Sequence, residues 1–405
     1  MYPQKIISCD MFCMVVGNYG DIGVCWRLAR QLASEHGVSV RLWVDDLASF
    51  RKLCPEIVPT QPIQQRHGVE IRHWGLILAE IVPAQLVIEA FACELPERYV
   101  LAMAGQLPKP VWLNLEYLSA EDWVAGCHGL PSPHPRLPLI KYFFFPGFTG
   151  ATGGLLLEND LLARRDAFQD DLVVQEKLWQ SLGVSARQTG EVRVSLFCYE
   201  NLAVSALLTA WAEGRLPVTC LVPEGRVLSQ VAAFFGRTKL VAGDVVQQGS
   251  LRVHILPLVE QEKYDSLLWA CDCNFVRGED SCVRAQWAGK PFVWHIYPQH
   301  DGVHVKKMRA LLELYCCGLE PEGKHAVRAL WELWNAGEVA AQDIMTSTEQ
   351  AASANPGQVW NDFLIHQSML SRHTKLWARQ LAGNNLALNL LDFSLKVGRI
   401  ASFKI

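Results

Sequence analysis

The sequence lacks an excess of positive charge, a long apolar run and a secretory leader. Its 405 residues include 37 Lys and Arg against 41 Asp and Glu, which gives a net charge of −4. Proteins that bind nucleic acid usually carry a basic excess, so we expect no nucleic-acid partner. No apolar run approaches the roughly 20 residues that cross a bilayer, and no secretory h-region follows Met1–Lys5. The sequence therefore predicts a globular, cytoplasmic protein without a membrane partner.

Disulfide, metal-ligand and hydrolase motifs are absent as well. The 13 cysteines are odd in number and irregularly spaced, which indicates free thiols in a reducing compartment. His300 and His304 have the spacing of one helix face, but no H-E-x-x-H motif accompanies them, so hydrogen bonding is favoured over a metal site. There is no Asp-x-Asp element, Walker A run or G-x-S-x-G elbow. We expect no metal and no other cofactor.

Apolar runs alternate with helical patterns along most of the chain. The stripe from Ile22 to His36, which Gly37 ends, is typical of an amphipathic helix. This alternation predicts mostly parallel, doubly wound sheets. The expected strands are 6–16, 38–44, 69–74, 86–91, 111–115, 142–145, 192–198, 218–222, 253–256, 271–276 and 292–296, and the expected helical stretches include 160–182, 201–213, 227–235, 261–270 and 359–381, with a loop at 131–135.

The length exceeds what one hydrophobic core usually serves, and the strand–helix series occurs twice. We predict two Rossmann-like domains, over residues 1–186 and 187–357, and a C-terminal helix over 358–405 that returns toward the first domain. Two such domains facing a cleft make the GT-B arrangement. Ligands in these sheets bind at the carboxyl ends of the strands, where both glycine-rich junctions, at Gly20 and Gly278, are expected.

A strand, a glycine turn and a helix start meet at Arg277–Ser281. Such a junction presents backbone N–H groups and the positive end of a helix, which suit a phosphate, and Arg277 adds a fork-shaped cation. Glu279 and Asp280 would repel a phosphate, so we expect them to turn toward hydroxyls or helix amides. A sugar diphosphate offers both kinds of group.

Further polar and aromatic residues follow neighbouring strands. Tyr297 and Gln299 come after the strand that succeeds the Arg277 junction, and their hydroxyl and amide suit phosphate or sugar oxygens. We favour this interpretation over an ordinary surface loop because several polar groups converge on one strand edge. Tyr199 closes the first strand of the second domain, where its ring is placed either to stack on a base or to fill the core.

Asp21 lies just after the first strand of the chain. Aspartate is a common helix N-cap, and the local pattern alone favours that role. The alternative is a carboxylate base directed into the cleft. No G-x-G-x-x-G fingerprint is present here, so a dinucleotide is not expected in this half.

Four segments carry a family resemblance: Asn18–Arg30 (NYGDIGVCWRLAR), Phe91–Pro96 (FACELP), Leu115–Glu121 (LEYLSAE) and Arg277–Gln299. They resemble the bacterial protein-arginine rhamnosyltransferases that act on translation elongation factor P, and the likeness covers both domains. The resemblance implies a GT-B fold, a TDP-rhamnose donor and inverting transfer of rhamnose to an arginine nitrogen of elongation factor P. It makes the first domain the acceptor side and the second the nucleotide-sugar side.

The resemblance also assigns roles by position. Asp21 matches a general base, and Glu279 matches a second essential carboxylate. The remaining matches are to substrate-binding positions. They are Asn18, Tyr19, Gly20, Tyr199, Gln261, Arg277, Gly278, Asp280, Ser281, Tyr297 and Gln299.

Two positions depart from the family pattern. Gly17 stands where the family has an Asp, and Leu258 stands where relatives have an aromatic that stacks on thymine. Two alternatives therefore stay open. One is a GT-B glycosyltransferase with another nucleotide sugar or acceptor. The other is a degenerate relative that binds a protein without catalysis, which Gly17 favours.

Overall fold

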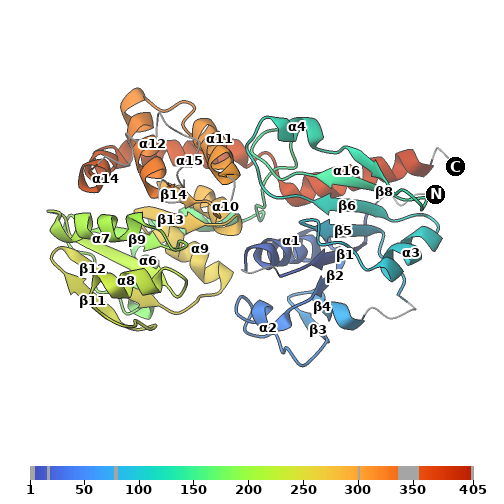
Figure 1. Cartoon of the computed structure of the whole chain (residues 1–405), viewed down its shortest axis with the longest axis horizontal. Helices are drawn as coiled ribbons and strands as arrows, with labels where there is room; N and C mark the ends of the chain where they lie inside the picture. Colours follow the sequence, from blue (N-terminus) through green and yellow to red (C-terminus); the bar gives the residue numbers. More distant parts are fainter. Residues whose placement is uncertain (1–4, 16–18, 77–80, 300–301, 336–354, 403–405) are drawn as a thin grey trace. The chain divides into compact units, whose positions relative to one another are not determined.

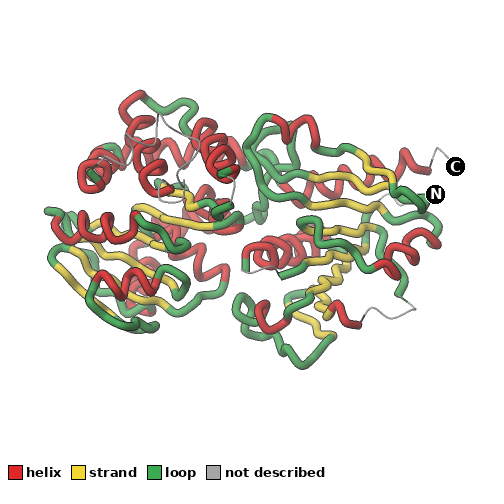
Figure 2. The backbone as a smooth tube through the Cα atoms, in the orientation of Figure 1, coloured by secondary structure: helices red, strands yellow, loops and turns green. Residues whose placement is uncertain are grey.

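The computed structural model describes residues 5–15, 19–76, 81–299, 302–335 and 355–402. The chain forms two compact units, whose helices and strands are labelled in Figure 1. Unit 1 comprises Met1–Asn159 and Leu381–Ile405, and unit 2 comprises Asp160–Gln380. Each unit contains one sheet whose strands lie side by side, with helices packed around it (Figure 2). The predicted α/β class with two domains is confirmed.

Unit 1 holds an eight-stranded sheet in the order β3-β4-β2-β1-β5-β6-β8-β7. The neighbours pair in parallel except at the two edges, where β3 and β7 run antiparallel. The strand order reverses at β1, which lies between β2 and β5. The strands are β1 (Ser8–Cys13), β2 (Ser39–Val44), β3 (Ile63–Arg66), β4 (Val69–His73), β5 (Leu86–Ala90), β6 (Val111–Leu115), β7 (Pro131–Pro133) and β8 (Ile140–Phe144).

Helix α1 (Gly20–His36) follows β1 and buries an apolar stripe that includes Ile22, Cys25 and Leu28. It ends as predicted at Gly37, whose φ of 64° is the left-handed conformation that glycine adopts without a Cβ clash. The last helix, α16 (Leu386–Ser402), contacts α1 and β6 and so belongs to unit 1 (red in Figure 1). The other helices are α2 (Leu47–Phe50), η1 (Trp74–Leu76), α3 (Glu97–Gly105) and α4 (Trp123–Cys127).

Unit 2 holds a six-stranded sheet in the order β11-β12-β10-β9-β13-β14, parallel except for β11. The order reverses at β9, which lies between β10 and β13. The strands are β9 (Val192–Leu196), β10 (Val218–Pro223), β11 (Val245–Gln248), β12 (Leu251–Leu256), β13 (Cys273–Arg277) and β14 (Phe292–His295). The helices are α5 (Leu161–Asp170), α6 (Leu172–Ser181), α7 (Ala203–Glu213), α8 (Leu228–Phe234), α9 (Gln261–Ala270), α10 (Asp280–Ala288), α11 (Val303–Tyr315), α12 (Pro321–Asn335), α14 (Pro356–Ile365) and α15 (Gln367–Leu381).

The unit boundaries differ from the predicted domain limits of 186 and 357. Helices α5 and α6 contact α9, and the Arg165 guanidinium donates a hydrogen bond of 2.8 Å to the Trp287 carbonyl, so this stretch belongs to unit 2. The predicted helix 359–381 is two helices, α14 and α15, separated at His366. Most of this segment also lies in unit 2, and only α16 joins unit 1.

Smaller differences concern strand ends and thiols. Pro131–Pro133 forms the edge strand β7, whereas a loop was expected there. The cysteines are free, as expected, and most are buried. Within the part of the chain that is described, none of the helices combines the length and apolarity that a membrane crossing requires.

Candidate active site

Arg277 ends β13 in unit 2 and holds a partly buried cation at the sheet edge. Its guanidinium lies over the rings of Phe197, at 4.2 Å from the centroid, and Tyr199, at 5.0 Å. One nitrogen donates a hydrogen bond of 3.3 Å to the Cys198 carbonyl. Among the described residues, no carboxylate lies within ion-pair distance of this guanidinium. The group is therefore placed to receive an anion from outside the fold.

A second cation reinforces this electrostatic environment. Burial is the main cause that lowers the pKa of Arg277; Tyr199 opposes it, and the positive charge of Arg226 adds a smaller contribution in the lowering direction. Arg226 lies in the loop between β10 and α8. In the sheet, β10 is the neighbour of β9 on the side opposite β13, which carries Arg277. Two guanidinium groups that repel each other gain most from a ligand with two negative charges, such as a diphosphate.

The glycine turn of the predicted junction is present. Gly278 has a φ of 62°, and a Cβ at this position would lie 3.2 Å from the Tyr199 hydroxyl. Its carbonyl accepts a hydrogen bond of 2.8 Å from the Trp294 indole. Helix α10 starts directly after the turn, with Glu279 at the N-cap making no capping hydrogen bond through its side chain. The positive end of a nine-residue helix thus lies beside the Arg277 cation.

Tyr199 and Tyr297 bring two aromatic rings to the same edge. Their centroids are 5.2 Å apart in an edge-to-face arrangement. The backbone N–H of Tyr199 donates a hydrogen bond of 3.2 Å to Nδ1 of the buried His295, which fixes the loop after β9 against β14. Burial raises the pKa of Tyr199 to about 12, so its hydroxyl keeps its proton and can donate a hydrogen bond.

The register of the sheet explains why these residues meet. Arg277 of β13 pairs with His295 of β14, and Phe275 pairs with Leu196 at the end of β9. The three strands are parallel, so the residues that follow them emerge at one edge. This is the edge beside the reversal of strand order at β9, where ligands of such sheets bind.

The remaining predicted residues of unit 2 lie around the same junction with different roles. Gln261 donates a hydrogen bond of 3.3 Å from Nε2 to Oδ2 of Asp280 and thereby links α9 to α10. The Ser281 hydroxyl accepts a hydrogen bond of 3.1 Å from the Arg277 N–H and donates one to the Arg277 carbonyl, so it is held by the local backbone. Gln299 is exposed, and its N–H donates a hydrogen bond of 3.1 Å to Nδ1 of His304.

The sequence did not single out Lys307, which the structure pairs with Glu279. Its Nζ lies 3.1 Å from Oε1 of Glu279, and both side chains are largely covered. Lys307 comes from α11, far along the chain from the junction. The one available signal is its spacing of three residues from His304, which places both on the same face of α11.

In unit 1, Asp21 lies in the first turn of α1, and Tyr19 occupies the N-cap. Asp21 is therefore not the capping residue that the local pattern alone favours. Its Oδ2 accepts a hydrogen bond of 3.3 Å from the Tyr117 hydroxyl, which follows β6. Tyr19 receives a hydrogen bond of 2.7 Å from Lys52, and Gly20 opens the helix.

Two residues named from the sequence in this segment, Gly17 and Asn18, lie outside the described residues, as does His300. The neighbouring His304 is buried and accepts the hydrogen bond from Gln299, which agrees with the hydrogen-bonding role favoured from the sequence.

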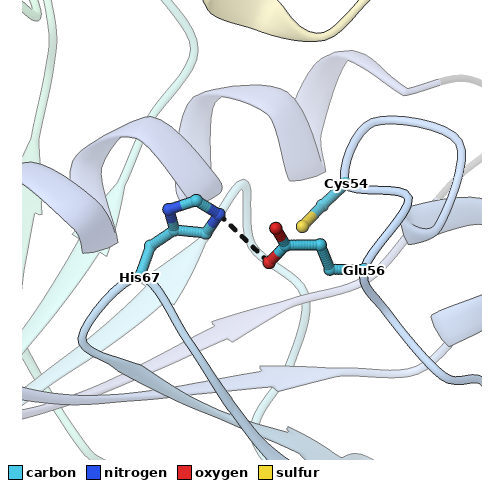
Figure 3. A group of neighbouring side chains, drawn as sticks. All are labelled: Cys54, Glu56 and His67. Atoms are coloured by element: carbon cyan, nitrogen blue, oxygen red, sulfur yellow. Dashed lines mark ion pairs between the residues drawn. The ribbon is translucent and has the colours of Figure 1, made fainter.

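One group of side chains in unit 1 has the composition of a metal site: Cys54, Glu56 and His67 (Figure 3). Their ligand atoms lie within 4.8 Å of one another, and Nε2 of His67 is 3.4 Å from Oε2 of Glu56. Burial raises the pKa of the Cys54 thiol, and the positive charges of Arg30 and Arg66 lower it by less. The positive charges of these two arginines would repel a bound metal cation. We therefore interpret the group as a surface ion pair beside a buried thiol.

Comparison with known proteins agrees with this geometry. Residues 9–395 match the family described as Elongation-Factor P (EF-P) rhamnosyltransferase EarP. The chain belongs to this family.

Individual relatives cover most of this chain. A protein-arginine rhamnosyltransferase of Pseudomonas putida is 49% identical over 385 residues, which cover 95% of this chain and 97% of that protein. One of Pseudomonas aeruginosa is 52% identical over 330 residues, which cover 82% and 87%. The chain is accordingly a protein-arginine rhamnosyltransferase.

A solved structure supports the fold assignment. It was described as the structural basis for EarP-mediated arginine glycosylation of translation elongation factor EF-P. It has a TM-score of 0.65 and 37% identity, and the comparison covers 95% of this chain and 98% of that chain. The GT-B type predicted for this EarP-family member is confirmed by that likeness together with its two Rossmann-like units.

Proposed function

We propose that this enzyme transfers rhamnose from TDP-rhamnose to one arginine side chain of translation elongation factor P, with inversion at the sugar carbon. The observation that carries the donor half is the Arg277 guanidinium, which lies on two aromatic rings without a carboxylate partner among the described residues. The proposed donor and acceptor rest on the resemblance to the family, which is described as an elongation factor P rhamnosyltransferase.

The donor half belongs to unit 2. Arg277, Arg226 and the start of α10 neutralise the two phosphates, and they do so more strongly as TDP departs and gathers charge. Gly278 lets the diphosphate approach the backbone closely. Tyr199 and Tyr297 offer aromatic faces and hydroxyls to the nucleotide and the sugar. Because cations and a helix terminus surround the leaving group, no metal is needed in this proposal.

The acceptor half belongs to unit 1, where Asp21 acts. A guanidinium is a poor nucleophile because its pKa lies above about 12 and its charge is delocalised. A carboxylate that binds one nitrogen localises the positive charge elsewhere on the group and accepts a proton as that nitrogen becomes bonded. Exclusion of water strengthens this effect.

The proposed step is a single displacement. The arginine nitrogen forms a bond to the anomeric carbon of rhamnose while the bond from that carbon to the diphosphate oxygen breaks. The nitrogen's proton passes to Asp21, and the bonding electron pair leaves with TDP. Glu279, which forms an ion pair with Lys307, is the second carboxylate of the proposal. It stabilises the positive charge that develops on the sugar ring as the bond to the diphosphate breaks.

Intact-protein mass spectrometry tests the proposal. Elongation factor P incubated with the enzyme and TDP-rhamnose should gain one deoxyhexose, and fragmentation should place it on arginine. A variant of elongation factor P with Lys in place of that arginine is the matched control and should gain nothing. No mass gain with the wild-type acceptor, or a gain on another residue, would refute the assignment.

Calorimetry with other nucleotides separates the donor from the alternatives. TDP should bind more tightly than UDP or GDP if the donor is TDP-rhamnose, as proposed. Equal affinity for all three would favour another nucleotide-sugar transferase. Tight TDP binding without any transfer would favour a degenerate, non-catalytic relative.

A further inference from the structure

A stacked pair of aromatic rings forms a platform at the edge of the unit 1 sheet. Phe91 follows β5 and Tyr117 follows β6, and their ring centroids are 4.6 Å apart with planes 23° from parallel. Ala90 pairs with Leu115 in the sheet, so the two adjacent parallel strands end together and deliver both rings to one edge. Tyr117 remains 43% exposed, so part of this aromatic surface is open to a ligand.

The backbone that carries the platform is held in an unfavourable conformation. Phe91, Ala92 and Glu94 have φ values of 57°, 53° and 52°, which L-residues with side chains adopt at a cost. Glycine would relieve that cost, yet none of the three is glycine. Strain of this kind collects at ligand sites, where the fold around it fixes one geometry.

Hydrogen bonds fix this strained loop to β6. The Phe91 N–H donates to the Leu115 carbonyl at 2.7 Å, and the Ala92 N–H donates to Oδ1 of Asn114 at 3.1 Å. Nδ2 of Asn114 in turn donates to the carboxylate of Glu116. The loop, the strand end and a carboxylate thus form one connected support behind the rings.

Negative charge lies beside the platform. The Tyr117 hydroxyl donates to Oδ2 of Asp21 at 3.3 Å, which places a carboxylate at the edge of the exposed ring. Glu116 adjoins the same ring in sequence. An aromatic face bordered by carboxylates has the features that a planar, weakly hydrated cation requires: a surface for stacking and oxygens for hydrogen bonds in the ring plane.

We propose that Phe91, Tyr117 and Asp21 form the subsite that receives the acceptor's guanidinium group. The arginine plane stacks on the Tyr117 ring, and its N–H groups reach Asp21. Tyr117 selects arginine through its ring face and positions Asp21 through its hydroxyl. This inference rests on the proposed function for its role in transfer, but the binding of a guanidinium can be measured without any donor.

Two substitutions separate the ring from the hydroxyl. Tyr117→Leu removes the stacking face and should raise the KM for elongation factor P by about 5- to 30-fold. Tyr117→Phe keeps the ring, so the KM should stay within about 2-fold while kcat falls by about 3- to 10-fold through loss of the bond to Asp21. Calorimetry should show unchanged TDP affinity for both variants, because the donor contacts lie in unit 2.

Tyr142→Phe is the matched control, since it removes a tyrosine hydroxyl from β8 of the same unit. It should leave KM and kcat unchanged. Thermal melting checks that the three variants remain folded. Unchanged KM for Tyr117→Leu in a folded protein would overturn the proposal, as would a KM increase in Tyr117→Phe that equals that of Tyr117→Leu.

A binding experiment distinguishes failure of this inference from failure of the proposed function. A peptide of elongation factor P with its arginine is compared by titration with the same peptide carrying citrulline, which has the shape without the charge. The arginine peptide should bind wild-type enzyme at least about 5-fold more tightly, and Tyr117→Leu should reduce that preference, leaving the part that the Asp21 carboxylate supplies. Preference without any transfer would leave the subsite standing and refute the proposed reaction. Transfer by the wild type without a preference that depends on Tyr117 would refute the subsite and leave the proposed reaction standing.

Discussion

The two sheets carry opposite chemistry at equivalent places. Each reverses its strand order at its first strand, β1 in unit 1 and β9 in unit 2, and each presents loops at the carboxyl edge there. In unit 2 the edge carries Arg277 and a glycine turn before a helix. In unit 1 it carries Asp21 and loop residues that are left-handed without being glycine. In the proposed function, the same topology therefore serves an anion in one unit and a cation in the other.

The two edges differ because the two proposed ligands need different hydrogen-bonding groups from the protein. A diphosphate is bound best by N–H groups, so the chain must come close, and a residue without a side chain allows that approach. A guanidinium has only hydrogen-bond donors, so it cannot accept a hydrogen bond from a backbone N–H group. It needs oxygens and a flat surface, which side chains supply, so glycine is of no advantage at that edge.

Removing the charged group of each unit tests this division most strongly. Asp21→Asn should lower kcat by about 1000-fold, because the group that accepts the proton is lost, while TDP affinity stays almost intact. Arg277→Met should weaken TDP binding by about 10- to 100-fold. Calorimetry with TDP and a mass-spectrometric transfer assay measure the two effects separately.

Arg252→Met replaces a half-buried arginine of β12 in unit 2, so it is the control for loss of positive charge and should change neither value. Loss of TDP binding in Asp21→Asn would contradict the assignment of the donor to unit 2. Normal TDP binding in Arg277→Met would show that the anion site lies elsewhere.

The ion pair between Lys307 and Glu279 offers the next largest effect. Lys307→Met leaves the carboxylate without this partner and should lower kcat by about 10-fold, while Lys307→Arg keeps the charge and should restore most of it. Steady-state kinetics at saturating donor measure both. An equal loss in the two variants would indicate that Lys307 contributes packing and not charge.

A substitution at Gly17, chosen from the sequence, tests whether a second carboxylate near Asp21 increases the rate of transfer. The resemblance found in the sequence places an Asp of the family at this position, so we predict that Gly17→Asp raises kcat by about 3- to 10-fold by adding a second carboxylate near Asp21 in sequence. Gly17→Asn is the matched control and should give no gain. An unchanged or lower rate for Gly17→Asp would show that this chain has compensated for the missing carboxylate.

Local sequence signals predicted many elements to within a residue or two. β6 at Val111–Leu115 and α9 at Gln261–Ala270 agree with the predicted ranges. β1 is shorter than the apolar run 6–16, because a strand ends where its partners end, and Ser8–Cys13 is the length that pairs with β2. Apolarity reports burial, whereas strand length depends on neighbours that are distant in sequence.

The candidate site shows the same limit. The Arg277 junction was predictable because strand, turn and helix start are consecutive in the chain. Lys307 and Arg226 were not, because each reaches the junction from another segment and a single lysine or arginine carries no local signal. The backbone strain at Phe91 was equally unpredictable, because the sequence Phe-Ala-Cys-Glu contains no residue that favours a left-handed backbone.

The smallest effect concerns the backbone itself and compares Ala92 with Gly278. Gly278→Ala should destabilise unit 2 by about 1–2 kcal/mol, because φ is 62° and the new Cβ would lie 3.2 Å from the Tyr199 hydroxyl. Ala92→Gly relieves the strain at a φ of 53°, but glycine gains freedom in the unfolded chain, so the net change should lie between zero and a stabilisation of about 1 kcal/mol. Urea unfolding followed by tryptophan fluorescence measures both.

If the strained loop exists to hold the Phe91–Tyr117 platform, Ala92→Gly should weaken acceptor binding although the fold is no less stable. A variant that is more stable and equally active would show that the left-handed loop serves no purpose in binding.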